Sequence, residues 1–148
     1  MTAEHGRLPV FVYGTLRPGQ AYHDRFLGGR IAGEEPGRMR GAVLYEGPGY
    51  PYAVADADGV IHGELITLAS AHYDILLASL DELEEHAPGD PDNLYERVTR
   101  EVLLAGGRTA RAWVYLAAEQ VARRLRASGT AVPGGDWPSG SAADRTSA

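Results

Sequence analysis

A turn near the start of the chain has residue types that suit anion binding. The apolar run Leu8–Tyr13 ends at Gly14, Thr15 and Leu16. Main-chain N–H groups that converge in such a turn can hold a carboxylate or a developing oxyanion. A glycine at position 14 permits close approach by a ligand. The segment is neither a GxGxxG motif nor a P-loop, so it does not indicate a nucleotide. The alternative is an ordinary strand-to-helix turn.

A second candidate is Glu84, which a helical projection places among leucines. With about 100° per residue, Glu84 lies roughly 40° from Leu80, inside the arc that also holds Tyr73, Leu76 and Leu77. The other acids of this segment, Asp74, Asp81, Glu82 and Glu85, fall about 100° or more from Leu80. A carboxyl group in an apolar setting has a raised pKa and suits general acid-base catalysis. The alternative is a solvated residue at a frayed helix end.

The elements that would position these residues follow from periodicity and turn signals. Strands are expected at 8–13, 40–45, 51–55, 60–68, 95–104 and 109–116, and helices at 21–27, 70–85 and 117–127. Ser70 is expected to cap the central helix, and Pro88 prevents it from continuing far. The segment Asp56–Gly59 predicts a hairpin turn. This order of elements predicts an α+β fold rather than regular βαβ winding.

Length and composition indicate one globular domain, expected at 8–137, with disordered tails at 1–7 and 138–148. The chain has 148 residues, of which 44% are hydrophobic and 23% charged. No apolar run reaches the ~20 residues of a membrane span, and the protein is expected to be cytoplasmic. The net charge of -6 argues against a general nucleic-acid binder. Without cysteine, and with five histidines that lack ligand spacing, no metal site is expected.

The chain contains, in order, the four segments "VYGTLRPGQAYH", "LASLDELEE", "LYERV" and "AWVYL". Together they resemble the γ-glutamylcyclotransferase-like (AIG2-like) family. The opening form, FVYGTL followed by GQ, looks closest to the γ-glutamylamine cyclotransferase branch. The resemblance covers residues 8 to about 137 and ends with "GGDWPSG", similar to a Gly-Asp-Trp signature of bacterial members. It implies a small mixed β-barrel with helices packed outside.

The resemblance also implies roles for particular residues. In that family the Tyr-Gly-Thr/Ser-Leu turn holds the γ-glutamyl group, which implies substrate binding by Tyr13, Gly14, Thr15 and Leu16. The last residue of LDxxE is the family's acid-base glutamate, which implies Glu84. The helical projection and the family motif therefore select the same carboxylate.

Further residues are expected in or near the pocket. They are Arg17, Tyr50, Tyr95, Arg97 and Tyr115, of which Tyr95 and Arg97 match the family's YxR motif. For Arg97 a structural ion pair is the alternative, and for the tyrosines it is local packing. Many members have glycine where this chain has Glu85, a departure that bears on substrate choice.

The implied reaction needs no cofactor, because the α-amine of a γ-glutamyl amide attacks its own γ-carbonyl and releases 5-oxoproline. The alternatives are a non-catalytic binding module and an enzyme that removes a γ-glutamyl cap from a larger biosynthetic amine. Arg17 and Arg97 are the nearby candidates to bind a second carboxylate, whereas Asp81, Glu82 and Glu85 make the helix end acidic. Amides of simple amines are therefore expected to be preferred over glutathione. The sequence does not predict the oligomeric state.

Overall fold

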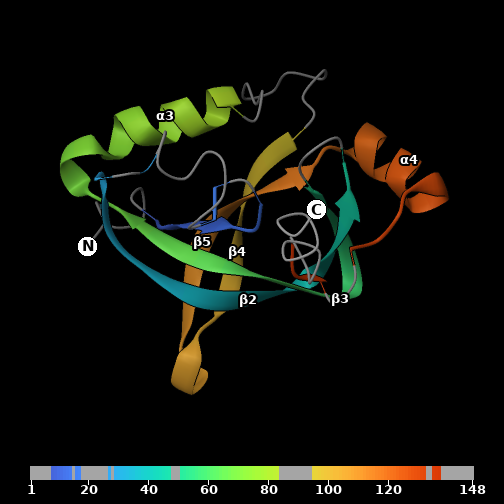
Figure 1. Ribbon diagram of the computed structural model, residues 1–148, viewed down its shortest axis with the longest axis horizontal. Coiled ribbons are helices and arrows are strands. Elements are labelled where there is room, and N and C mark those ends of the chain that lie inside the picture. Colours follow the sequence, from blue (N-terminus) through green and yellow to red (C-terminus); the bar gives the residue numbers. More distant parts are fainter. Residues whose placement is uncertain are drawn as a thin grey trace, which may run out of the picture.

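The computed structural model describes residues 8–14, 16–17, 27, 29–47, 51–83, 95–132 and 135–137. Within these residues the strands form a closed barrel in the order β1-β3-β2-β4-β5. The strands are β1 (Val10–Val12), β2 (Ile31–Glu46), β3 (Pro51–Leu68), β4 (Tyr95–Leu103) and β5 (Thr109–Ala117). The helices are η1 (Ser70–His72), α3 (Tyr73–Leu83), η2 (Ala105–Gly107) and α4 (Glu119–Ser128). Figure 1 shows α3 and α4 at opposite sides of the barrel. The expected barrel with outer helices is confirmed.

The barrel is mixed because β1 has one antiparallel and one parallel neighbour. It pairs antiparallel with β3, Phe11 opposite Leu65, and parallel with β5, Val10 opposite Trp113. Its three side chains, on both faces, are buried, which explains why the sequence there is continuously apolar. The short strand β1 therefore holds the turn that follows it against both β3 and β5.

Two hydrophobic clusters lie on the two sides of the barrel wall. The barrel core fills the interior and includes Phe11, Tyr13, Met39, Leu44, Ile61, Val114 and Trp137. The helix-side core lies between α3 and the strands and includes Val10, Val12, Leu16, Ile66, Tyr73, Leu76, Leu80, Tyr95 and Tyr115. Alternate residues of β1 enter the two clusters, as the period of a strand requires. The buried face expected for the central helix is confirmed at Tyr73, Leu76 and Leu80.

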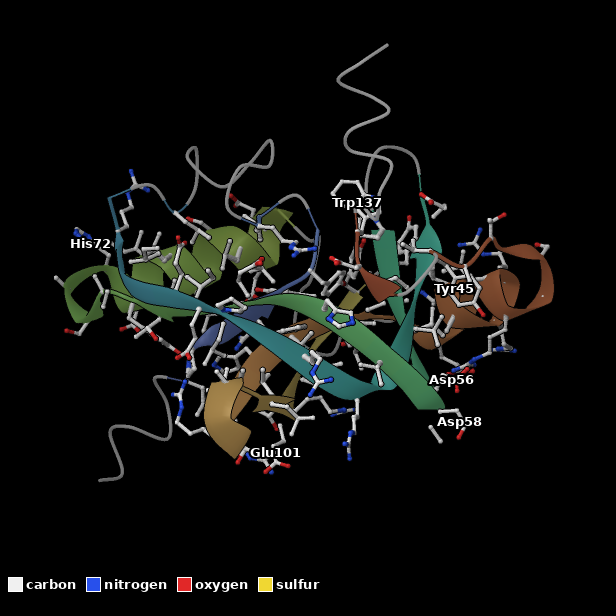
Figure 2. All side chains as sticks on the ribbon, turned by 60° about the horizontal axis from the view of Figure 1, so that its bottom comes forward. Tyr45, Asp56, Asp58, His72, Glu101 and Trp137 are labelled. Atoms are coloured by element: carbon white, nitrogen blue, oxygen red, sulfur yellow. The ribbon has the colours of Figure 1, made fainter. Side chains whose placement is uncertain are left out.

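The predicted hairpin turn at Asp56–Gly59 is wrong. These residues lie inside the 18-residue strand β3, whose pairing with β2 shifts from Arg40 opposite Val60 to Ala42 opposite Ala55. The four residues 56–59 therefore bulge opposite the single residue Gly41, which has φ 94°. These residues do form the local hydrogen bond of a turn, since Asp58 N–H donates to Asp56 Oδ1 at 3.0 Å. The turn bends the strand but does not reverse its direction. Figure 2 shows these two aspartates together at that bend.

Other boundaries differ as well. The strand expected from Arg40 begins at Ile31, nine residues earlier, and pairs with β3 along nearly its whole length. The N-cap of η1 is Ala69, with no side-chain capping bond, and Ser70 is the first residue of the short 3₁₀ turn that leads into α3. The predicted strands at 95–104 and 109–116 and the predicted late helix are confirmed within two residues. The helix expected at 21–27 and both tails lie outside the described residues, apart from Leu27.

Candidate functional site

The turn after β1 is anchored on both sides of the barrel wall by its own side chains. Tyr13 is 7% exposed in the barrel core, and its hydroxyl donates to the main-chain oxygen of Tyr115. Leu16 is 5% exposed and lies in the helix-side core. The turn is closed by Arg17 N–H donating to Gly14 O at 2.9 Å. A ligand at this turn would therefore meet its main chain rather than the Tyr13 ring or the Leu16 side chain.

Gly14 is needed for packing within the protein. A Cβ built on Gly14 would lie 2.9 Å from Cδ and 3.1 Å from Cγ of Pro51, the first residue of β3. The close approach that glycine permits here is made by Pro51, whereas the sequence suggested a ligand. A methyl group at position 14 would displace Pro51, so this substitution would not separate binding from folding.

Aromatic side chains continue from Pro51 toward β4. The Tyr95 hydroxyl donates to Pro51 O at 3.2 Å, and the Tyr95 ring stacks on Tyr52 with centroids 5.4 Å apart. Tyr95 is 5% exposed and belongs to the helix-side core. The YxR tyrosine thus holds the start of β4 against the start of β3, beside Gly14.

The YxR arginine forms an ion pair with the central helix. Arg97 Nε and Nη2 donate to the two carboxylate oxygens of Asp81 at 2.8 and 3.1 Å, and both side chains are 17% exposed. The Tyr115 hydroxyl donates to Asp81 Oδ1 at 2.6 Å. The Arg97 guanidinium also lies 4.4 Å from the centre of the Trp113 ring. Asp81 therefore joins the end of α3 to β4 and β5.

Asp81 belongs to this group of contacts but was not among the residues selected from the sequence. The helical projection placed it outside the apolar arc, yet its side chain is only 17% exposed. The long side chains of Arg97 and Tyr115 nevertheless reach it from the strands. The sequence did offer a signal for this ion pair. The acid of LDxxE and the arginine of YxR have opposite charges and lie in consecutive elements, α3 and β4.

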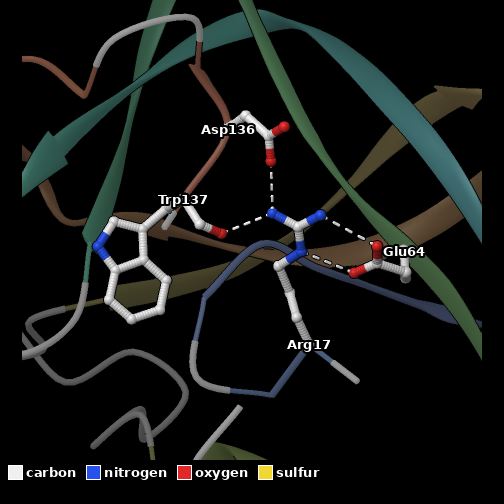
Figure 3. Close-up of polar contacts among 4 residues, drawn as sticks. All are labelled: Arg17, Glu64, Asp136 and Trp137. Carbon is white, nitrogen blue, oxygen red and sulfur yellow. Dashed lines mark hydrogen bonds and ion pairs between the residues drawn. The ribbon is translucent and has the colours of Figure 1, made fainter. Parts of the chain in front are cut away.

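Arg17 connects the turn to two other segments, as Figure 3 shows. Its guanidinium binds both carboxylate oxygens of Glu64 on β3, at 2.8 and 3.1 Å, and Asp136 Oδ1 at 2.6 Å. It also donates to the main-chain oxygen of Trp137. Burial alone lowers the pKa of Arg17, but hydrogen bonds and the charges of Glu64 and Asp136 raise it overall. The stabilisation by this cation is complete below its ordinary pKa and is lost only as pH rises through the raised value, far above neutral.

Replacing Arg17 by methionine should lower the free energy of unfolding by about 2–3 kcal/mol, because Glu64 and Asp136 lose a charge-assisted partner in a part-buried site. The matched control is Arg108→Met, since the Arg108–Glu35 pair is 58% and 39% exposed and should contribute less than about 1 kcal/mol. Urea denaturation measures both variants. Equal losses of unfolding free energy in the two variants would show that the contacts of Arg17 with Glu64 and Asp136 do not stabilise the protein more than an exposed ion pair does.

An open pocket of about 440 Å³ lies beside Arg17, Glu64 and Asp136. Its wall includes Arg38, His62 and Gly63, and, of the predicted site residues that the structure describes, Arg17 alone lines it. Side chains of both charges line the pocket, among them Arg38, Glu35 and Glu64. Among the described residues, no cluster of histidine, aspartate or glutamate has the geometry to hold a metal ion. Likewise, none of the described helices is long and apolar enough to cross a membrane.

The structure thus brings together most of the predicted residues that it describes. Tyr13, Gly14, Tyr95, Arg97 and Tyr115 are linked through shared contacts at the end of the barrel where β3 and β4 begin and β5 ends. Arg17 points to the neighbouring outer surface of β3. Three further predicted residues, Glu84, Thr15 and Tyr50, lie outside the described residues.

Comparison with known proteins identifies a family over most of the chain. A family profile described as "Gamma-glutamyl cyclotransferase, AIG2-like" matches residues 10–139. This range includes β1, the turn, the LDxxE segment and all five strands.

Individual relatives agree with this match. A Niallia circulans protein named "Gamma-L-glutamyl-butirosin B gamma-glutamyl cyclotransferase" is 32% identical over 108 residues, which cover 72% of this chain and 65% of that protein. A curated relative from Halalkalibacterium halodurans is 38% identical over 96 residues, 64% of this chain and 76% of that protein. The crystal structure of a mouse AIG2-like protein has the same fold, with a TM-score of 0.60, 23% identity and coverage of 75% and 77% of the two chains.

Proposed function

Because this chain belongs to the AIG2-like γ-glutamyl cyclotransferase family, we propose that it converts a γ-glutamyl amine to 5-oxoproline and the free amine. The observation that carries the proposal is the family match over residues 10–139, which contains both the substrate turn and LDxxE in one segment. The contacts among Tyr13, Tyr115 and Asp81 support it, because they connect the two motifs in space.

In the proposed reaction, the substrate carries its own nucleophile. The α-amine forms a C–N bond to the γ-carbonyl carbon, and the original amide C–N bond breaks. Glu84 takes the proton that the attacking amine loses and gives it to the departing amine, so the carboxylate is regenerated. Orientation of the two substrate groups is the main requirement, since the reaction is intramolecular.

The turn at 13–16 would hold the substrate through its main chain. The Tyr13 side chain is buried in the barrel core and the Leu16 side chain in the helix-side core, so both ends of the turn are held in place without a ligand. A rigid turn can place N–H donors toward the α-carboxylate or the tetrahedral oxyanion without reorganisation in the reaction.

The two arginines expected near the pocket bear on the substrate preference. Arg17 and Arg97 each make a bidentate pair with a carboxylate of this chain, Glu64 and Asp81 respectively. Binding of a second substrate carboxylate by either arginine would have to compete with these pairs. We therefore propose amides of simple amines as better substrates than glutathione.

The ion pair of Asp81 with Arg97 also makes the helix end less acidic than the sequence suggested. The charge of Asp81 is balanced by Arg97, so attraction of a cationic amine depends on Glu82, which is exposed, and on Glu85. Such attraction between exposed charges weakens as salt is added.

The test is 5-oxoproline release from γ-glutamyl amines, γ-glutamyl amino acids and glutathione, each at low and high ionic strength. We expect kcat/KM for the amines to exceed that for glutathione by roughly tenfold at low salt, and the ratio to fall at high salt. Release from none of these substrates would favour a binding module. Glutathione turned over as fast as the amines would overturn the substrate preference and leave the reaction type intact.

A larger γ-glutamyl amine is a second candidate substrate. It is favoured by the Niallia circulans relative, whose name specifies γ-L-glutamyl-butirosin B as its substrate. Adding that compound to the assay decides between the two. A kcat/KM at least tenfold above the simple amides would assign a deprotection role to this chain.

A further inference from the structure

Tyr115 contacts both halves of the proposed site. Its main-chain oxygen accepts a hydrogen bond from the hydroxyl of Tyr13, the first residue of the substrate turn. Its own hydroxyl donates to Asp81, near the end of α3, at 2.6 Å. With 4% of its surface exposed, Tyr115 is fixed by packing as well as by these bonds.

Asp81 is held from two strands at once. One oxygen accepts from the Tyr115 hydroxyl of β5 and from Arg97 Nε of β4, and the other accepts from Arg97 Nη2. The Arg97 guanidinium in turn makes a cation–π contact with the Trp113 ring. Three directed donors on one carboxylate restrict both its position and its rotation.

We propose that Asp81 and Tyr115 are positioning residues that set the end of α3 relative to the substrate turn, and through it Glu84. Asp81 precedes Glu84 by three residues in the chain. A displacement of about 1 Å can cost ~100-fold in rate when a catalytic group must meet a reacting atom. This inference rests on the proposed function, because it concerns the geometry of that reaction.

The opposite end of α3 supplies a matched control. The Tyr73 hydroxyl donates to Leu8 O at 2.7 Å and accepts from Trp113 Nε1 at 3.1 Å. Tyr73 is the first residue of α3 and, like Tyr115, is a buried tyrosine whose hydroxyl links α3 to β5. Removal of either hydroxyl breaks a hydrogen bond between α3 and β5, at opposite ends of the helix.

The experiment compares Tyr115→Phe, Asp81→Asn and Tyr73→Phe in the full-length chain, with 5-oxoproline release as the assay. Tyr115→Phe keeps the main-chain oxygen that binds Tyr13, so we expect kcat to fall roughly 10- to 100-fold with KM nearly unchanged. Asp81→Asn should behave similarly. Tyr73→Phe should lower the melting temperature while kcat stays within about twofold of the parent.

A complementary variant tests the other bond of Tyr115. Tyr13→Phe loses the hydroxyl that fixes the turn, so its main effect should be a higher KM. If Tyr115→Phe and Tyr73→Phe changed kcat equally, or if Tyr115→Phe acted only on KM, the positioning role would be wrong.

Amide hydrogen exchange over residues 76–83 gives a readout that does not depend on activity. Exchange should accelerate at least fivefold in Tyr115→Phe and Asp81→Asn and remain near the parent rate in Tyr73→Phe. If the parent released no 5-oxoproline, the proposed function would fail, and the exchange comparison would still decide whether Tyr115 and Asp81 fix this end of α3. Equal exchange in all three variants would overturn the inference.

Discussion

Replacing Glu84 by glutamine should leave the protein folded and lower kcat by roughly 100- to 10,000-fold, the range attributed to a single acid-base group. The substitution keeps the size of the side chain and removes the proton that must move from the attacking amine to the leaving amine. Steady-state 5-oxoproline release measures the loss, and thermal unfolding checks that the fold is retained.

The matched control is Glu82→Gln, which removes an exposed carboxylate from the same helix. It should change kcat/KM for a cationic amine less than about threefold, and only at low salt. If Glu82→Gln were the inactive variant and Glu84→Gln retained the parent rate, the assignment of the catalytic glutamate would be wrong.

The second large effect is expected at Gly63, where β3 passes very close to β1. A Cβ at this position would lie 2.1 Å from Val12 O and 2.9 Å from Phe11 Cζ, both in β1. Because the main-chain oxygen cannot move away without breaking the pairing of β1 with β3, Gly63→Ala should lower the free energy of unfolding by about 3 kcal/mol or more. That is a large part of the ~5–15 kcal/mol that stabilises a typical domain.

Gly33→Ala is the control for Gly63→Ala. Gly33 also lies in a long strand, β2, but nothing approaches its Cβ position within 4 Å. The substitution Gly33→Ala should therefore leave the free energy of unfolding unchanged or raise it by up to about 1 kcal/mol. Urea denaturation of both variants tests the comparison, and equal stabilities would contradict the close approach at Gly63.

Periodicity predicted the elements whose contacts lie mainly on one face. The central helix was predicted because Tyr73, Leu76 and Leu80 recur at helical spacing, and these side chains are buried. The strands β4 and β5 were predicted with nearly correct ends, since Gly106 and Gly107 separate them and adopt φ values of 72° and 79°. In these cases local sequence and tertiary packing favour the same structure.

The errors arose where the pairing of β2 with β3, rather than local composition, decided the outcome. The residues Asp56–Gly59 have the composition of a hairpin turn, but β2 continues to pair on both sides of them. Pairing with β3 also extends β2 back to Ile31, through a segment that contains Pro36 and the adjacent acids Glu34 and Glu35. Local propensity carries no information about such a partner.

The site was predictable to the extent that its residues belong to motifs. Tyr13, Tyr95 and Arg97 were selected from the sequence, and the structure gives each a defined partner. Asp81 was predicted to lie outside the apolar arc, and a projection of one helix does not include the side chains that reach this residue from the strands. Partners supplied by β4 and β5 decide its environment.

The parallel pairing of β1 with β5 has a consequence for protein synthesis. Val10 pairs with Trp113, and Trp113 N–H donates to Pro9 O at 2.9 Å, so the first strand of the barrel needs a partner made about a hundred residues later. Contacts of such long sequence separation form late in folding, because a large loop must close first. While β2 and β3 can pair as soon as they leave the ribosome, the Tyr13–Leu16 segment gains its support from β5 only after nearly the whole domain has emerged. A nascent chain arrested before residue 109 should therefore lack the support that β5 gives to the Tyr13–Leu16 segment, even when the long β2–β3 pair has formed.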